Sequence, residues 1–354
     1  MTPASARKRK KVELPKKGRA LQIVEPGKFE IVEIDVPQPR EDEVLIEVLA
    51  CSTCTNWELS MWQGRDIFAR PGFPKYPLNP GAPGHEAAGR VVAVGAEVKE
   101  IQVGQLVAVK PSLRGPENDA HATHIVRPEA EVAPVADHVP PEEAAPLEMA
   151  MCALRSVELA FQQYQGLRST DPQAGEQADE AQPAAVVVGL GPAGQLHLQT
   201  ARLAGLEPVV GIEPVAERRE VARQFADAVF APDDPALVEY LGRVGERLVF
   251  ECSGAAPAMA TAVSLAVGTV HIFGVPDGRW TYGQKAWISG AALLPYHWRG
   301  RRQAPLLRQA ANLLSEGKLQ TRPLISTVLP YERYDEGLAL LKRRRALKVI
   351  FRWE

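Results

Sequence analysis

Cysteine is scarce in this sequence, which has four in 354 residues: Cys51, Cys54, Cys152 and Cys252. So few thiols over such a length exclude a small fold held together by disulfides. Thiols that stay reduced are available as metal ligands, or they are simple core residues.

A dominant charge is also missing, since 41 Lys and Arg residues face 43 Asp and Glu residues, for a formal net charge of -2. Such a chain has no overall electrostatic attraction to nucleic acid or to an acidic membrane. It has no uncharged apolar run of the roughly 18 residues that a membrane span needs, and its first residues lack the apolar segment of a signal peptide. We therefore expect a cytoplasmic protein with neither nucleic acid nor a membrane as a partner.

The length predicts two domains, at roughly 150 residues each. Residues 1–18 contain the basic run Arg7–Lys11 without an apolar period, so we expect a disordered basic tail there. After Arg19 the sequence changes to short runs of high β propensity with turn residues between them, which predict a β-rich domain. These runs are Ala20–Val24, Phe29–Val36, Glu43–Ala50, Gly89–Val94 and Gln105–Val109.

The second half alternates strand-like and helix-like segments, which is typical of a parallel sheet with helices on both faces. Apolar residues recur at helical spacing from Leu147 onward, after Pro140-Pro141, and residues 165–183 are polar and predict an exposed loop. The predicted strands are Ala184–Val188, Glu207–Ile212, Arg247–Glu251, Thr269–Val275 and Ala346–Arg352. The predicted helices are Gln195–Ala204, Glu217–Phe225, Leu306–Leu314 and Glu336–Lys342.

A glycine-rich segment of the form G-x-G-x-x-G joins the strand Ala184–Val188 to a helical pattern. The first glycine permits a tight turn, the second lets a pyrophosphate approach the backbone, and the third lets helix and strand pack closely. The alternative is a glycine turn that binds nothing. We predict that the segment binds a dinucleotide through Gly189, Gly191, Pro192, Ala193 and Gly194.

Glu213 ends the next predicted strand, about 20 residues past Gly191, where a carboxylate accepts hydrogen bonds from a ribose diol and repels a 2′-phosphate. This favours NAD over NADP. Arg218 could stack on the adenine or help to hold a phosphate. Ser253 and Val275 complete the predicted cofactor-binding residues.

Several motifs in order resemble the medium-chain alcohol dehydrogenases. The run from residue 84 to 98 resembles their zinc signature G-H-E-x-x-G-x(5)-G-x-x-V, and Ala50–Cys54 is similar to the C-G-x-C that ends their third strand. Leu147–Leu154 resembles the L-E-P-L-A-x-A-L segment of the polyol and threonine dehydrogenase branch, and the glycine loop is also similar. The resemblance therefore runs from about Arg19 to Arg352. The signature is matched at Gly84, His85, Glu86, Gly89, Gly95 and Val98.

The resemblance implies an α/β plus β architecture, with a GroES-like β-rich catalytic domain and an inserted Rossmann-fold dinucleotide-binding domain. We expect the catalytic domain at residues 19–155 and 295–354, the Rossmann domain at 156–294, and the tail at 1–18. A homodimer or homotetramer is also implied, joined through the Rossmann sheet by edge pairing of Thr269–Val275.

The resemblance further implies one zinc ion per chain, held by Cys54, His85 and one of Glu86 or Glu148. A zinc ion that acts on an alcohol needs N, S or O ligands and one open position. The plainer alternatives are a hydrogen-bonded turn histidine for His85 and a small core residue for Cys54. A second zinc is not expected, because residues 95–130 contain no cysteine.

Two features depart from the family pattern. Asn56 stands where relatives have a Ser or Thr that passes the alcohol proton outward, and an amide cannot relay a proton as a hydroxyl does. We predict Asn56 and Glu148 as catalytic residues. The stretch between Cys54 and His85 is also longer than usual, and its aromatic residues either line an apolar pocket or pack the loop. They are Trp57, Trp62, Phe68, Phe73 and Tyr76.

These expectations favour an NAD-linked, zinc-dependent dehydrogenase or reductase acting on a small secondary alcohol or ketone of the polyol, cyclitol or amino-alcohol type. One alternative is a zinc-free medium-chain reductase of a C=C or C=N bond. Another is a nucleotide-binding module without turnover. Zinc content separates the first two, and any hydride transfer excludes the third.

Overall fold

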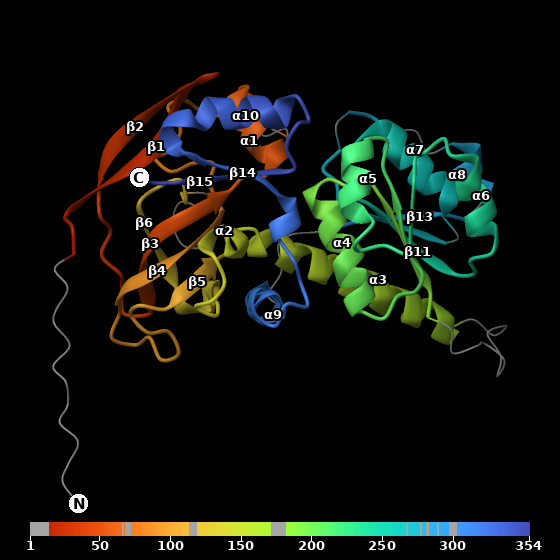
Figure 1. The fold of residues 1–354 in the computed structure, drawn as a ribbon, viewed down its shortest axis with the longest axis horizontal. Coiled ribbons are helices and arrows are strands. Elements are labelled where there is room, and N and C mark those ends of the chain that lie inside the picture. The colour runs from red at the N-terminus through yellow and green to blue at the C-terminus, as the bar shows by residue number, and fades with distance from the viewer. Residues whose placement is uncertain are drawn as a thin grey trace, which may run out of the picture.

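The computed structural model describes residues 14–354, apart from 66, 68–71, 113–118, 171–181, 267, 277, 281–282, 289 and 297–302. Its elements form a β-rich body and an α/β body, on the left and right of Figure 1. No helix in the described residues is long and apolar enough to cross a membrane.

The β-rich body is built on a seven-stranded sheet in the order β14-β15-β3-β4-β5-β7, with β6 also pairing with β3, and on a separate hairpin of β1 and β2. Segments from both ends of the chain share the sheet, because β15 pairs with β3. Its N-terminal strands are β1 (Lys17–Glu25), β2 (Lys28–Asp35), β3 (Glu43–Ser52), β4 (Glu86–Val94), β5 (Leu106–Val109), β6 (His124–Pro128) and β7 (Val132–Pro134). Its C-terminal strands are β14 (Ile325–Pro330) and β15 (Lys348–Arg352).

The α/β body contains a six-stranded sheet in the order β10-β9-β8-β11-β12-β13, and every pairing in it is parallel. The central strand is the apolar run Ala184–Val188, all of it buried, as a strand covered on both faces requires. Chain order reverses between β8 and β11, and ligands bind at the carboxyl ends of strands at such a switch point. The strands are β8 (Ala184–Val188), β9 (Val209–Ile212), β10 (Ala228–Phe230), β11 (Arg247–Glu251), β12 (Thr269–Ile272) and β13 (Ala292–Pro295).

The helix α3 runs along both bodies in Figure 1 and contributes buried residues to the cores of both. The β-rich body also carries α1 (Thr55–Trp62), α2 (Pro141–Ala144), α9 (Gln303–Ser315), α10 (Tyr334–Lys342) and the short helices η1 (Glu129–Glu131), η2 (Arg322–Leu324) and η3 (Tyr331–Arg333). The others are α3 (Leu147–Thr170), α4 (Pro192–Leu203), α5 (Ala216–Ala222), α6 (Pro235–Gly242), α7 (Ala256–Leu265) and α8 (Gln284–Ile288).

Every predicted strand is present, and the predicted helices overlap α3, α4, α5, α9 and α10, so the α/β plus β fold class is confirmed. The loop predicted from residue 165 is wrong at its start, because α3 continues to Thr170; residues 171–181 lie outside the described residues. The expected edge pairing of Thr269–Val275 is also wrong, because β12 lies between β11 and β13, and β13 is the strand at that edge of the sheet.

Two predicted boundaries stay predictions. The strand β1 begins at Lys17, before the predicted end of the tail at residue 18, while residues 1–13 lie outside the described residues. The predicted division at residues 155 and 156 falls inside α3, so a continuous helix joins the two parts.

Candidate active site

Three of the four predicted metal ligands converge at the junction of β3, α1 and β4. Cys54 precedes the first turn of α1, and His85 and Glu86 stand where β4 begins. Their donor atoms all lie within 4.8 Å of one another. A thiolate, an imidazole and a carboxylate are a donor set that catalytic zinc uses, with a fourth position open.

Glu86 is fully buried and only half partnered. Its Oε2 accepts a hydrogen bond from Lys348 Nζ at 2.5 Å, and neither side chain is exposed. Its Oε1 is buried and has no hydrogen-bond partner among the described residues. An unpartnered buried carboxylate oxygen costs free energy unless something fills the position, and a metal ion beside Cys54 and His85 would do so. These residues therefore fit a zinc ion.

His85 presents one ring nitrogen to this cluster. Its Nδ1 donates to the carbonyl oxygen of Pro83 at 3.1 Å, so Nε2 is the ring nitrogen available to a metal ion. Burial alone would lower the pKa of His85, but the hydrogen bond to Cys54 and the charges of Cys54, Glu148 and Glu86 raise it well above its usual value. Negative charge thus concentrates around this imidazole, as a cation site requires.

Glu148, the fourth predicted ligand, is near the cluster but is not one of the three convergent groups. It lies in the first turn of α3, where its Oε1 accepts a hydrogen bond from the Cys152 thiol at 3.4 Å. Its charge acts on His85 and on Glu86, raising the pKa of both. Tyr296, which follows β13 in the α/β body, forms a hydrogen bond with Cys152. A residue of the α/β body thus contacts the neighbour of Glu148.

The second predicted catalytic residue, Asn56, is exposed in the first turn of α1, two residues after Cys54. Some of the aromatic residues that follow it make ring contacts: Trp57 stacks on Phe73, and Trp62 contacts Tyr334 edge-on. Phe68 lies outside the described residues.

The glycine loop has the geometry that a pyrophosphate needs. Gly189 has φ +88°, and Gly191 directly precedes the first turn of α4. A side chain at Gly194 would place its Cβ 2.0 Å from the carbonyl oxygen of Gly189, so only glycine permits this close packing. Pro192 and Ala193 form the helix start, where unpaired amides favour an anion.

Glu213 supports this loop directly. Its buried carboxylate accepts hydrogen bonds from the amide of Leu190 at 2.7 Å and from the amide of Val215 at 3.1 Å. Arg218 lies on the other side of the loop, with its Nη1 3.9 Å from the position that a Cβ at Gly191 would take. A carboxylate and a guanidinium therefore flank the glycine loop, beside which doubly wound folds bind the adenosine end of a dinucleotide.

Ser253 and Val275 follow β11 and β12 at the same carboxyl edge of the sheet. The Cβ of Ser253 lies 2.7 Å from the position of a Cβ at Gly189, which brings it against the glycine loop. Val275 contacts Gly254 through its backbone. All the predicted cofactor-binding residues thus lie around the switch point of the sheet.

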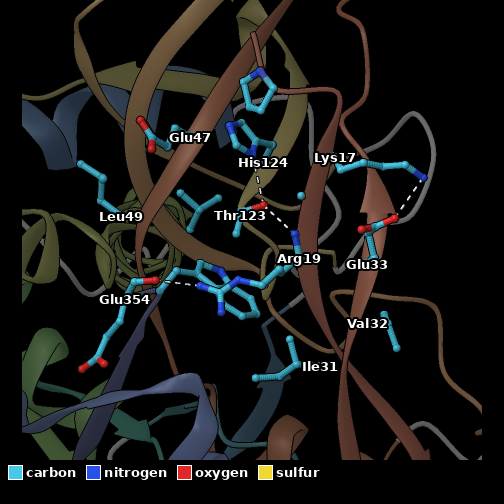
Figure 2. A pocket seen from close by; sticks show the side chains of 14 residues that line it. Lys17, Arg19, Ile31, Val32, Glu33, Glu47, Leu49, Thr123, His124 and Glu354 are labelled. Carbon is cyan, nitrogen blue, oxygen red and sulfur yellow. Dashed lines mark hydrogen bonds and ion pairs between the residues drawn. The ribbon is translucent and has the colours of Figure 1, made fainter.

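A separate groove contains none of the predicted site residues. A cavity of about 730 Å³ opens between β1, β2 and β3 beside the C-terminus, and no predicted site residue lines it. Figure 2 shows an ion pair of Lys17 with Glu33 and a hydrogen bond from Arg19 to the main-chain oxygen of Glu354. The chemistry of the metal cluster, and not the presence of a cavity, therefore identifies the site.

Two family models match the chain in the expected order. The alcohol dehydrogenase GroES-like domain matches residues 40–135, and the zinc-binding dehydrogenase model matches residues 192–301. The chain belongs to the zinc-type medium-chain dehydrogenase superfamily. It is thus an alcohol dehydrogenase-like oxidoreductase, and the resemblance inferred from the sequence is confirmed.

Relatives of this medium-chain dehydrogenase match it over nearly its whole length. L-threonine 3-dehydrogenase from Pyrococcus horikoshii is 29% identical, covering 94% of this chain and 97% of that enzyme. An oxidoreductase from Escherichia coli has a TM-score of 0.79 at 19% identity, covering 96% and 99% of the two chains. The structure of 2R,3R-butanediol dehydrogenase from Bacillus subtilis has a TM-score of 0.75 at 21% identity, covering 95% of this chain and 100% of that one. At such identities the two structures show the shared fold alone.

Sequence reasoning missed Lys348, Tyr296 and the pair formed by Glu58 and His121. Lys348 stands in a predicted strand, where a lysine normally indicates a solvent-facing position, but the strand is central and the side chain is fully buried. No local signal distinguishes it, because its partner Glu86 lies far away in the sequence.

Proposed function

We propose that this medium-chain dehydrogenase is a zinc-dependent, NAD-linked enzyme that oxidises a secondary alcohol or reduces the corresponding ketone. The observation that carries the proposal is the convergence of Cys54, His85 and Glu86 within 4.8 Å. The nucleotide loop at the switch point of the neighbouring sheet supports it. The similar L-threonine 3-dehydrogenases favour an amino-alcohol or polyol substrate, because threonine is itself a secondary alcohol with an amino group.

The residues of the site have separate roles in metal binding, positioning and proton transfer. Cys54, His85 and Glu86 hold the ion, and Lys348 holds Glu86 in place. When bound, the zinc ion supplies a Lewis acid that lowers the pKa of the substrate hydroxyl. Glu148 stands beside the cluster as the acceptor for the outgoing proton, since the exposed amide of Asn56 cannot relay it.

Metal analysis of protein purified without a chelator tests this assignment. We expect about one zinc ion per chain, and near-complete loss of both zinc and turnover in Cys54→Ser and in His85→Ala, because losing a ligand removes the Lewis acid. Cys252→Ser is the matched control, since Cys252 is a buried cysteine outside the cluster. Full turnover in Cys54→Ser would contradict the proposal.

NAD is the proposed cofactor because Glu213 would meet a 2′-phosphate with like charge. Glu213→Gln keeps an acceptor for the Leu190 amide but removes the charge, and we expect the preference for NAD(H) over NADP(H) to fall about tenfold, which corresponds to about 1.4 kcal/mol. Glu217→Gln, on the exposed start of α5, is the control. Kinetics with both cofactors measure the ratio, and an unchanged ratio in Glu213→Gln would overturn the assignment.

One observation favours the zinc-free reductase as a second candidate. Lys348 already places a positive charge 2.5 Å from Glu86, so this carboxylate has a counter-charge without a metal ion. That enzyme would contain no stoichiometric zinc, would tolerate Cys54→Ser, and would be sensitive to substitution of Asn56.

We also propose a homodimer or homotetramer that pairs along β13, one of the two edge strands of the parallel sheet. An unpaired strand edge offers a row of amides and carbonyls to a second copy. Sedimentation of a 38.6 kDa monomer at micromolar concentration would contradict this assembly.

A further inference from the structure

A buried network of polar side chains lies one helical turn beyond Cys54. Glu58 Oε1 accepts a hydrogen bond from His121 Nε2 at 3.0 Å, and Glu58 Oε2 accepts one from the Tyr334 hydroxyl. The Nδ1 of His121 lies 3.0 Å from the Tyr331 hydroxyl oxygen. All four side chains have an exposed fraction of 0%, so these groups depend on one another and not on water.

The network joins segments that are far apart in the sequence. Glu58 comes from α1, His121 from the segment that leads into β6, Tyr331 from η3 and Tyr334 from α10. In Figure 1 the helices α1 and α10 lie side by side over the β-rich body, and their residues are in contact. The position of α1 is thus set by parts of the chain that the metal cluster does not include.

The helix α1 cannot hold its own position. It has eight residues, Thr-Asn-Trp-Glu-Leu-Ser-Met-Trp, and no side chain caps its start at Cys54. Isolated helices of this length are unstable in water, and Thr, Asn, Ser and Trp are weak helix formers. Tertiary contacts must therefore fix where the helix begins, and the Glu58 carboxylate is its one charged anchor.

Glu58 is connected to the metal cluster through the backbone. Its amide donates to the carbonyl oxygen of Cys54 at 2.8 Å, the first hydrogen bond of the helix. The Glu58 side chain is held by hydrogen bonds from His121 and Tyr334, and through this backbone bond it also fixes the position of Cys54. Metal sites require their ligands within about 0.5 Å of the productive geometry.

We propose that Glu58 and His121 are positioning residues of the metal site, which fix the start of α1 and with it the direction of the Cys54 thiol. This inference rests on the proposed function, because it takes Cys54 as a zinc ligand. Apolar residues of similar volume often stabilise a core as well as a buried ion pair does, so stability alone does not account for this pair. Control of the Cys54 geometry accounts for the presence of this pair.

Glu58→Gln tests the inference, with Glu131→Gln as its matched control. Glu131 forms a second buried ion pair in the same body, 3.3 Å from Lys110, with 7% and 5% of the two side chains exposed. Both variants lose a buried carboxylate charge, but Glu131 lies on η1 and not on α1. A difference in zinc binding between the two variants would therefore reflect the contact of Glu58 with the helix that starts at Cys54, and not a general loss of stability.

The readouts are the zinc dissociation constant, measured by competition with a chromophoric chelator, and the absorption spectrum of the Co²⁺-substituted protein. We expect zinc binding to weaken about 10- to 100-fold in Glu58→Gln, as for residues that orient metal ligands, with a shifted thiolate-to-cobalt band. Glu131→Gln should retain wild-type affinity and spectrum, even if both variants unfold at lower denaturant concentration.

Tyr334→Phe keeps the proposal testable if Glu58→Gln does not fold. It removes one donor to Glu58 but keeps the ring contacts with Phe29 and Phe351, whose centroids lie 5.6 and 5.0 Å away. We expect a smaller effect in the same direction. Wild-type zinc affinity and cobalt spectrum in both variants would overturn the inference while the proposed function stands. If wild-type protein purified without a chelator contains no zinc, the proposed function is overturned, and this inference with it.

Discussion

Asn56 stands exposed in the first turn of α1, two residues after the proposed zinc ligand Cys54. If a hydroxyl there can pass the alcohol proton outward, Asn56→Ser should retain or raise the rate of alcohol oxidation. Steady-state kcat in the oxidation direction is the measurement, with Thr55→Ser beside it as a control for small changes at the start of the helix. A tenfold or greater fall in kcat for Asn56→Ser alone would show that the amide itself orients the substrate.

Single residues differ in how far the sequence predicts their surroundings. The family resemblance predicts His85 and Glu86 from the zinc signature and Cys54 from a second motif. The pairing of Ser52 on β3 with Glu86 on β4 is what brings the two motifs together. The bond from Lys348 to Glu86 was not predictable, because it needs the pairing of β15 with β3, which brings the C-terminal segment into the first sheet. The same holds for Glu58 and His121, whose pairing depends on how α1 lies against the segment before β6.

The helix α1 also carries a prediction about pH. Burial alone would lower the pKa of His121, but Cys51 on β3 and Glu58 on α1 raise it to about 10 from 6.5, with Tyr331 and Tyr334 also facing the pair. A pKa that is raised in the folded state gives stability that is fully present below pH 6.5 and is lost as pH rises through about 10.

Denaturant unfolding between pH 6.5 and 10 measures this loss. We expect the free energy of unfolding to fall with pH across that window in the wild-type protein. The slope should be smaller in Glu58→Gln, which lacks one of the two groups that raise the pKa of His121. Removal of one partner from a buried ion pair should also cost about 3–5 kcal/mol near neutral pH. Parallel pH profiles for the two proteins would show that His121 is not held charged by Glu58.

Elements with a clear hydrophobic period were predictable, and those defined by tertiary contacts were not. The strand β11 matches its predicted bounds because its apolar run ends at turn residues on both sides. The helix α1 was missed because its sequence favours neither helix nor strand, and it forms where Glu58 and Trp62 find partners. The last turn of α3 was predicted as loop because residues 165–170 are mostly polar and include Gly166, a pattern that a loop and the end of a long helix share.

The arrangement of the whole molecule follows from motif order and not from periodicity. The alternation of strands and helices predicts a parallel sheet, although β10 and β13 were not among the predicted strands. The observed strand order places the glycine loop at the switch point of that sheet. The return of β14 and β15 to the first sheet was expected only from the resemblance to a known family. Pairing between distant segments carries no local signal, so the edge position of β13 was also beyond sequence reasoning.

The most direct test of zinc-dependent hydride transfer compares one preparation of the protein with and without its zinc ion. Zinc is removed with a chelator, its absence is verified by metal analysis, and turnover is followed by nicotinamide absorbance with NAD and a panel of L-threonine, butane-2,3-diol and pentitols. We predict nearly complete loss of turnover on stripping and its return when about one equivalent of zinc per chain is added back. A metal-free preparation that turns over at the full rate would contradict the account.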